Sequence, residues 1–278
     1  MPFHRKAALL SAAFLLLTLD GCTAQPWLSP QEKAENIAKT AGFELRKIAT
    51  PQFQLTTFQA AAPLGSDTLT VYIEGDGAPW ISSSRPPGDP TPLTPVSLIL
   101  ASKDSRRPVL YIGRPCQYLD ETELASCHVK YWTSARFAPE VIEALDSVIT
   151  KVKTAGGARQ VRLIGFSGGG VIAALLAARR KDMESLVTVA APLDTDAWSA
   201  FHQISPLRGS LNPMDFIREL SPIRQTHLFG EKDAIVPPDY TKTVRKKMPF
   251  AAYVFIPSYT HDCCWTENWP ELLLRKSQ

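Results

Sequence analysis

Residues 160–178 read QVRLIGFSGGGVIAALLAA, and this stretch decides the fold class. The run QVRLI predicts a buried β-strand, and the Ala-rich run that ends the segment predicts an α-helix. Between them lies G-x-S-x-G, in which Gly165 and Gly169 stand two residues before and after Ser167. Small residues at these positions permit a sharp strand-to-helix turn. Such a turn lifts the serine hydroxyl above the strand end, where the helix dipole favours a developing anion. A phosphate-binding glycine turn is the alternative, but G-x-G-x-x-G does not occur.

Strands and helices alternate on both sides of this segment. Strands are expected at 43–48, 53–58, 70–73, 109–112, 160–164, 186–190, 226–229 and 251–256. Helices are expected at 30–41, 139–153, 168–180 and 267–275. This alternation predicts an α/β fold with a mostly parallel central sheet and helices on both faces. Residues 78–95, rich in Pro, Ser and Gly, are expected to form a loop, and about 192–224 a small cap over one end of the sheet.

Length and composition agree with one folded α/β domain or two smaller ones. The chain has 278 residues, of which 45% are hydrophobic, so it can bury a large core without metals or many disulfides. The chain has 30 Lys and Arg residues and 27 Asp and Glu residues, and no run of five like charges occurs. This near balance disfavours a nucleic-acid-binding surface.

The motif in its strand-turn-helix context resembles the α/β-hydrolase family. The resemblance covers roughly residues 43–275 and implies one domain at 43–278 with that fold. In the family the catalytic residues follow one another as Ser, acid and His. The resemblance implies Ser167 as nucleophile, Asp233 in FGEKDAIVP as acid, and His261 in PSYTHD as base.

Each of these residue types suits its implied role. Serine is a weak nucleophile until a base removes its proton, and an acid holds the imidazole in the correct tautomer and stabilises its cation. Other residues remain open at this point. The alternative acids are Glu231, Asp194 and Asp196, and the alternative bases are His128, His202 and His227.

The resemblance also implies an oxyanion hole made of two backbone N–H groups. One belongs to Gly168, directly after the nucleophile, and the other to Asp76 in EGDG at 74–77. The family usually has histidine where this chain has Glu74, and a carboxylate at Asp76 disfavours an oxyanion unless it points away. Substrate-lining residues are expected among those after the strands. They are Trp80, Tyr131 and Trp132, for which ordinary packing is the alternative.

The N-terminal residues 1–21 have the pattern of an export signal. Arg5 and Lys6 precede an apolar run of 13 residues, which is too short to span a membrane but suits a signal peptide. The following L-D-G-C resembles the bacterial lipobox, which implies cleavage before Cys22 and acylation of that cysteine. Residues 22–42 are then a tether and a short helix, and Thr23 is typical of the outer-membrane type, facing the periplasm. A soluble periplasmic or secreted protein, cleaved nearby without lipid, is the alternative.

Export makes disulfides possible for the four remaining cysteines. Cys116 and Cys127 enclose only ten residues, so a local disulfide between them is the favoured pairing. The pairing of Cys263 and Cys264 stays open. No motif has zinc-ligand spacing, so no metal site and no cofactor are predicted.

Taken with the resemblance, these patterns predict an exported serine hydrolase that cleaves a carboxylic ester through an acyl-enzyme. Its substrate would be a small-molecule or lipid ester, and its membrane contact a lipid anchor. An acyltransferase or thioesterase with the same three residues is one alternative, since water and alcohols attack the same intermediate. A non-catalytic binding protein of the cell envelope is the other.

Overall fold

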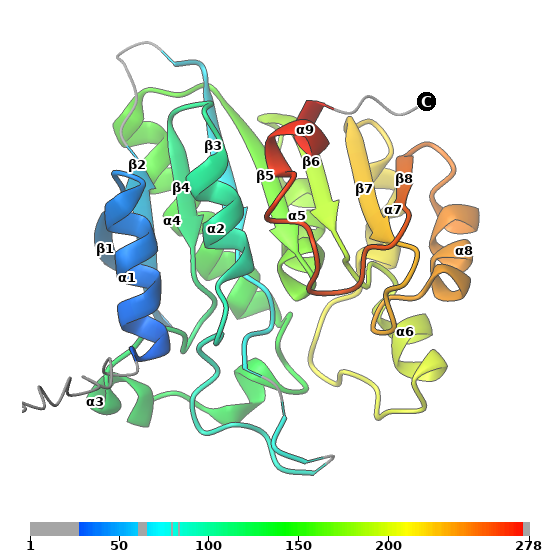
Figure 1. The fold of residues 1–278 in the computed structure, drawn as a ribbon, viewed down its shortest axis with the longest axis horizontal. Helices are drawn as coiled ribbons and strands as arrows, with labels where there is room; N and C mark the ends of the chain where they lie inside the picture. The colour runs from blue at the N-terminus through cyan, green and yellow to red at the C-terminus, as the bar shows by residue number, and fades with distance from the viewer. Residues whose placement is uncertain (1–27, 61–65, 79, 83, 275–278) are drawn as a thin grey trace, which may run out of the picture.

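The computed structural model describes residues 28–60, 66–78, 80–82 and 84–274. Its centre is an eight-stranded sheet in the order β1-β2-β4-β3-β5-β6-β7-β8 (Figure 1). From β4 to β8 neighbouring strands are parallel, whereas β2 runs antiparallel to both β1 and β4. The strands are β1 (Glu44–Ala49), β2 (Gln54–Ala60), β3 (Thr68–Ile73), β4 (Val109–Ile112), β5 (Gln160–Phe166), β6 (Met183–Val189), β7 (Gln225–Gly230) and β8 (Ala252–Ile256).

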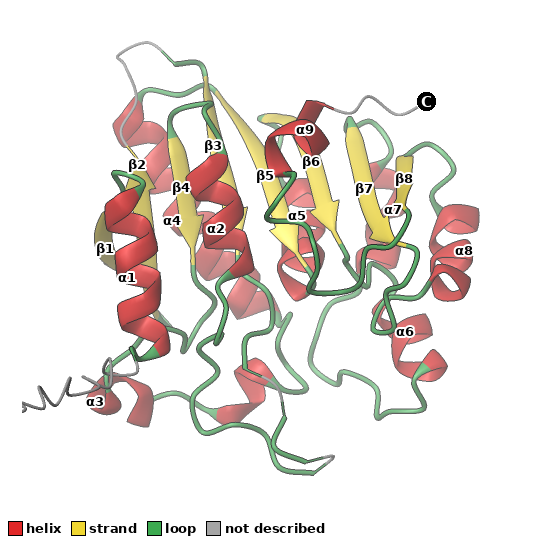
Figure 2. Ribbon diagram, in the orientation of Figure 1, coloured by secondary structure: helices red, strands yellow, loops and turns green. Residues whose placement is uncertain are grey.

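Helices lie on both faces of this sheet (Figure 2). The α-helices are α1 (Pro30–Thr40), α2 (Val96–Lys103), α3 (Glu121–Ala125), α4 (Pro139–Gly156), α5 (Gly168–Arg179), α6 (Thr195–Phe201), α7 (Ile217–Leu220), α8 (Pro238–Lys247) and α9 (Trp269–Leu274). Two short 3₁₀ helices are η1 (Val129–Trp132) and η2 (Pro213–Phe216). Helices α1, α2 and α9 contribute to one apolar core and α4, α5 and α8 to the other.

The strand sequences explain why the sheet has a core on each side. In β3, Val71 and Ile73 join the core that contains α4 and α5, while Tyr72 between them joins the core that contains α1 and α2. Successive side chains of a strand point to opposite faces, so a fully apolar run such as TVYI serves both cores. The expected α/β architecture is therefore confirmed.

The two helices beside β5 differ in how they are buried. Helix α4 has apolar side chains at helical spacing on one face. It begins at Pro139 and ends at Gly156, and the next residue, Gly157, caps it with a φ of 72° that suits glycine. Helix α5 is apolar on nearly all sides, and its residues from Gly168 to Ala177 are buried. A helix of this kind belongs in the interior, where it holds the turn before it in place.

Parallel strands bring their carboxyl ends to one edge of the sheet, and the loops that follow them meet there. This end, called the carboxyl-end face below, is the lower end of the molecule in Figure 1, toward which β5 and β6 point. Within 192–224 lie α6, η2 and α7. Among the described residues, no helix is long and apolar enough to cross a membrane.

Candidate active site

Ser167 sits in the sharp turn between β5 and α5. Its backbone angles are φ 51° and ψ −125°, a conformation that L-residues rarely adopt. The turn is possible because its two glycines lack side chains. A Cβ on Gly165 would collide with the backbone of Gly169, and a Cβ on Gly169 would collide with the carbonyl oxygens of Ile73 and Glu74. The small residues required by the sequence pattern therefore have a direct steric reason.

His261 and Asp233 lie beside this serine although they are far from it in the chain. The Nε2 of His261 is 3.0 Å from Ser167 Oγ, and its Nδ1 is 2.9 Å from Asp233 Oδ2. Asp233 is buried, and its Oδ1 accepts hydrogen bonds from the backbone N–H groups of Ile235 and Val236, both at 2.8 Å. The carboxylate is thus fixed by the loop after β7 and presents its other oxygen to the imidazole.

The loop that carries His261 is held against its surroundings. The indole N–H of Trp265 donates to the carbonyl oxygen of His261 at 2.9 Å, and Trp265 is fully buried. The ring of Phe166 lies 5.3 Å from the imidazole ring. The backbone N–H of Lys232 donates to the carbonyl of Tyr259, which joins the acid loop to the histidine loop. The imidazole is therefore preorganised between the acid and the serine.

Two of the other acids considered from the sequence have partners away from the histidine. Asp194 caps α6 through the N–H of Ala197 and pairs with Lys247 at 2.5 Å. Asp196 accepts a hydrogen bond from Asn212. Neither carboxylate is among the groups that contact His261.

The other histidines are also engaged elsewhere. His227 lies in the core beside Thr188 and Gln225, and burial lowers its pKa to about 3. His202 contacts the carbonyl of Ile235, and His128 caps η1. None of these rings is the one that contacts Ser167.

The loop after β3 lies next to the start of α5, as the oxyanion-hole expectation requires. A Cβ on Gly75 would stand 3.6 Å from the Cβ of Ser167, and a Cβ on Gly168 would collide with the carboxylate of Asp76. Gly168 is the first residue of α5, so its N–H has no acceptor within the helix. The structure thus brings the Gly168 and Asp76 segments together at the nucleophile.

The carboxylate of Asp76 is compensated by two arginines that sequence reasoning missed. Arg114 Nη1 lies 2.8 Å from Asp76 Oδ1, and Arg136 Nη1 lies 2.6 Å from Oδ2. Arg114 also donates to the backbone carbonyl of Arg136 at 2.6 Å. Burial alone raises the pKa of Asp76, but Arg136 and Arg114 outweigh it and lower that pKa to about 2. Two guanidinium groups around one carboxylate leave a net positive charge beside the serine.

Glu74, which stands where the family usually has histidine, is a buried support for the same loop. Its carboxyl group accepts hydrogen bonds from the N–H of Gly75 at 2.9 Å, the N–H of Ser97 at 3.3 Å and the hydroxyl of Tyr111 at 2.9 Å. Burial raises the pKa of this carboxyl group. Its contacts tie the loop after β3 to α2 and β4.

A cavity of about 720 Å³ with a mostly apolar surface is lined by residues of the segments that follow β3, β4 and β6. Trp80, Trp198, Ile204 and Leu207 are among the residues that line it, together with Arg136. Arg136 reaches Asp76 on the oxyanion side, and the indole N–H of Trp198 donates to the carbonyl of Ile235, two residues after Asp233, at 2.7 Å. Arg136 and Trp198 thus link the cavity lining to the loop after β3 and to the acid loop, although Ser167, His261 and Asp233 do not line the cavity.

Two of the three expected substrate-lining aromatic residues lie outside that cavity. The Tyr131 ring packs edge-on against Phe53 at 4.7 Å, and its hydroxyl donates to Glu140. Trp132 is buried and donates to the carbonyl of Pro87. Their contacts are those of ordinary packing, the alternative considered from the sequence. Trp80 does line the cavity.

The four described cysteines form two disulfides. Cys116 pairs with Cys127, the pairing that the short spacing favours, with 5.9 Å between their Cα atoms. Cys263 pairs with its neighbour Cys264, which resolves the pairing that the sequence left open. The first disulfide lies two residues after Arg114, and the second lies two residues after His261.

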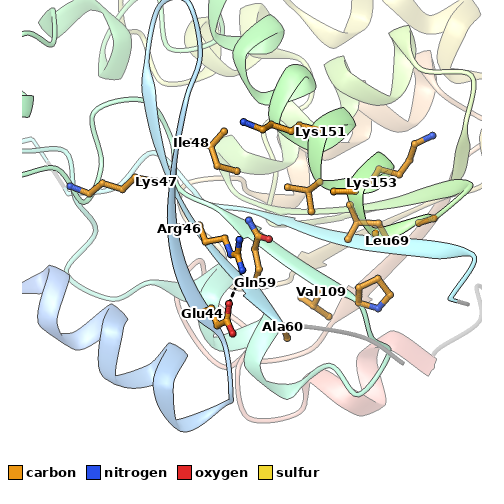
Figure 3. Close-up of a pocket in the computed structure, with 15 residues that line it drawn as sticks. Glu44, Arg46, Lys47, Ile48, Gln59, Ala60, Leu69, Val109, Lys151 and Lys153 are labelled. Carbon is orange, nitrogen blue, oxygen red and sulfur yellow. Dashed lines mark hydrogen bonds and ion pairs between the residues drawn. The ribbon is translucent and has the colours of Figure 1, made fainter. Parts of the chain in front are cut away.

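A second cavity, of about 780 Å³, lies at the opposite end of the sheet (Figure 3). Its lining includes Glu44, Arg46, Lys47 and Lys153, and Figure 3 shows the ion pair between Arg46 and Glu44. Lys47 and Lys153 have acidic partners outside the cavity, Glu123 and Asp182. No residue of the serine site lines it, so it plays no part in the arrangement described above.

Comparisons with known proteins place this geometry in a fold. No family model and no curated protein matches the chain. Among solved structures, Est1E from Butyrivibrio proteoclasticus matches with a TM-score of 0.57 and 13% identity, over 83% of this chain and 97% of that one. The Pyrococcus furiosus esterase Pf2001 matches with a TM-score of 0.55 and 14% identity, over 84% and 90%.

A third structure leads to the same result. An α/β serine hydrolase homologue from Coxiella burnetii matches with a TM-score of 0.54 and 16% identity, over 82% of this chain and 93% of that one. The likeness extends over most of each molecule and agrees with the strand order and the turn at Ser167. The chain has the α/β-hydrolase fold.

Proposed function

We propose that the chain is a serine hydrolase that cleaves a carboxylic ester through an acyl-enzyme. The observation that carries this proposal is the continuous set of contacts from Ser167 Oγ through His261 to the buried carboxylate of Asp233. A serine hydroxyl with a base at 3.0 Å, itself oriented by an acid, is the arrangement that activates serine as a nucleophile.

The reaction has two halves with the same proton carrier. In the first, His261 Nε2 takes the proton of Ser167 Oγ while that oxygen bonds to the ester carbonyl carbon. The bond to the alcohol oxygen then breaks, and the alcohol leaves with the proton from His261. In the second, His261 takes a proton from water, whose oxygen attacks the acyl-enzyme. The carboxylic acid leaves, and Ser167 regains its proton.

The charge around the nucleophile supports stabilisation of the tetrahedral oxyanion. The N–H groups of Gly168 and Asp76 are the proposed donors, and preorganised donors of this kind are worth about 3 kcal/mol each in acyl transfer. Because Arg114 and Arg136 compensate the Asp76 carboxylate, that side chain does not oppose the developing charge.

The apolar cavity supports an ester with a sizeable apolar group. Trp80, Trp198 and Leu207 present apolar surface to it, and burial of apolar groups is favourable by about 0.8 kcal/mol per methylene. The fold is also that of an esterase from Pyrococcus furiosus. Both points favour ester hydrolysis as the activity to test first.

The test combines covalent labelling with turnover. A fluorophosphonate probe should label the wild-type protein and not Ser167→Ala, because the probe bonds to an activated serine oxygen. A panel of esters with graded acyl length, assayed with and without an added alcohol, should yield free acid. A new ester of the added alcohol, formed in place of the free acid, would indicate an acyltransferase. Absence of both labelling and turnover would contradict the enzyme proposal.

We also propose that the enzyme is exported and anchored by lipid on Cys22, on the periplasmic side of the outer membrane. The support is the basic and apolar pattern of residues 1–21 followed by L-D-G-C. These residues lie outside the described part of the chain. More than one acyl chain is needed for stable anchoring, and an acylated N-terminal cysteine of this type carries two or three.

A further inference from the structure

Large apolar side chains are exposed mainly on the carboxyl-end face. Six of them come from loops and short helices that follow different strands, and Ile81 and Leu93 are the most exposed, at 61% and 58%. Those six are Trp80, Ile81, Leu93, Val129, Ile204 and Ile235. Each lies in a segment that follows the carboxyl end of a strand, at the end of the sheet where Ser167 also lies.

The same class of side chain is sparse at the other end of the sheet. Leu28 and Phe201 also lie at the carboxyl-end face, whereas Leu45 at the start of β1 and Phe250 just before β8 lie at the opposite end. Single exposed apolar residues are normal on any protein. Their concentration on one face marks a surface that contacts another apolar phase.

The chain before the first helix also starts from this face. Helix α1 packs against α2 and β1, and the helix begins toward the lower end of the molecule in Figure 1. Pro30 lies eight positions after Cys22, so the segment between them reaches at most about 28 Å when fully extended. A compact domain of this length is about 45 Å across. A lipid at Cys22 therefore lets the carboxyl-end face, and not the opposite end, rest on the membrane.

We propose that the carboxyl-end face docks on the lipid bilayer to which the chain is anchored, and that Ser167 acts on an ester of a membrane lipid. This inference rests on the proposed function. Exposed apolar side chains enter the interfacial region of the bilayer, and one of them, Trp80, also lines the apolar cavity. The lipid ester then reaches the nucleophile without crossing water.

The test uses the processed protein reconstituted in vesicles of phosphatidylethanolamine and phosphatidylglycerol. The variant Ile81→Ser/Leu93→Ser/Val129→Ser removes apolar surface from the docking face without changing any residue placed in the site. The variant Leu45→Ser/Phe250→Ser is the control, since it also replaces exposed apolar side chains, but at the other end of the sheet. Each sample hydrolyses a fluorogenic lipid ester embedded in the vesicles and a water-soluble ester added outside.

We expect the first variant to lose at least tenfold in rate on the embedded ester while its rate on the soluble ester stays within twofold of wild type. The control should change neither rate. Equal rates on the embedded ester for wild type and both variants would overturn the docking proposal. If the wild-type protein hydrolyses neither the embedded nor the soluble ester, the hydrolase proposal is contradicted instead.

A binding measurement keeps the two proposals separate. In Ser167→Ala, acyl-chain-brominated lipid should quench tryptophan fluorescence, and the added Ile81, Leu93 and Val129 changes should reduce that quenching. If the processed chain carries no lipid, flotation with added vesicles replaces reconstitution, and the same variant must float less than the control. If the Ile81, Leu93 and Val129 changes convert a dimer to a monomer in solution and leave quenching and flotation unchanged, this face joins two copies of the chain. That result would contradict docking on lipid.

Discussion

At the scale of single residues, the site depends on groups whose roles follow from their partners. One carboxylate oxygen of Asp233 accepts hydrogen bonds from two backbone N–H groups, and the other contacts His261. The backbone contacts therefore hold the carboxylate independently of the imidazole. The same residue type at Asp76 has a different role because two guanidinium groups surround it. Environment, more than residue type, separates an orienting acid from a charge-compensated support.

The three residues of the proposed triad should act as one unit. Ser167→Ala and His261→Ala should each lower kcat for an ester by about 10³-fold or more, and the double variant should be little worse. Asp233→Asn should cost less than either, because the base remains but is less well oriented. Steady-state kinetics on one soluble ester measures all four variants.

The control for this series is a change to a carboxylate with other partners. Asp196→Asn should keep wild-type kcat, since its carboxylate contacts Asn212 and not His261. Full activity in a folded Ser167→Ala protein would refute the mechanism. Full activity in Asp233→Asn together with loss in Asp196→Asn or Asp194→Asn would move the acid to the loop after β6.

Asp76 should matter for stability as well as for the site. Asp76→Asn leaves Arg114, whose side chain is only 4% exposed, without its charged partner. Removing one member of a buried ion pair costs about 3 kcal/mol, so the free energy of unfolding should fall by that amount. Asp239→Asn is the control, because its ion pair with Lys242 is exposed to solvent and should contribute little to stability. Urea unfolding monitored by circular dichroism compares the two.

The pH dependence of this effect has a definite sign. The pKa of Asp76 is depressed in the folded chain from 3.8 to about 2, so its stabilising contribution is present above the unfolded value and is lost as the pH falls toward 2. The shift corresponds to at most about 2 kcal/mol, less because the side chain keeps 30% of its surface exposed. The stability gap between wild type and Asp76→Asn should therefore shrink between about pH 5 and about pH 2. A gap that stays constant over this range would contradict the assignment.

At the scale of elements, strands were predictable and several helices were not. Every strand expected from the sequence is present, although β6 begins at Met183 and not at Leu186. Helix α2 was missed because VSLILASK is an apolar run without helical spacing, and it is buried along most of its length. Helix α8 was missed because only Tyr240, Thr241 and Val244 of its ten residues are buried, too few to stand out as a pattern.

The loop between β4 and α4 is closed by the disulfide between Cys116 and Cys127. Peptide mapping under non-reducing conditions should recover the two peptides joined. Replacing both cysteines by serine should lower the free energy of unfolding by about 3 kcal/mol in the chain-entropy model for a loop of this length. Peptides joined instead to Cys263 or Cys264 would contradict the pairing, and an unchanged unfolding midpoint would contradict the stabilisation.

At the scale of the whole molecule, the sheet determines which distant residues meet. Ser167, Asp233 and His261 follow three parallel strands, so the family's order of Ser, acid and His implied their meeting once the strands were placed. The contacts of Asp76 with Arg114 and Arg136 span 38 and 60 residues and depend on side-chain reach across loops. Nothing in local spacing or periodicity encodes such pairs, which is why sequence reasoning named Asp76 without its partners.

Anchoring also belongs to the whole molecule, because it decides which end of the sheet meets the membrane. Mass spectrometry of the N-terminal peptide should show acyl chains on Cys22, and Cys22→Ser should move the enzyme from the membrane fraction to the soluble one or block its processing. Cys264→Ser is the control, since that cysteine lies beyond β8 and should leave membrane attachment unchanged. An unmodified terminus that begins elsewhere would remove the anchor. The exposed apolar side chains of the carboxyl-end face would then have to hold the enzyme on lipid by themselves.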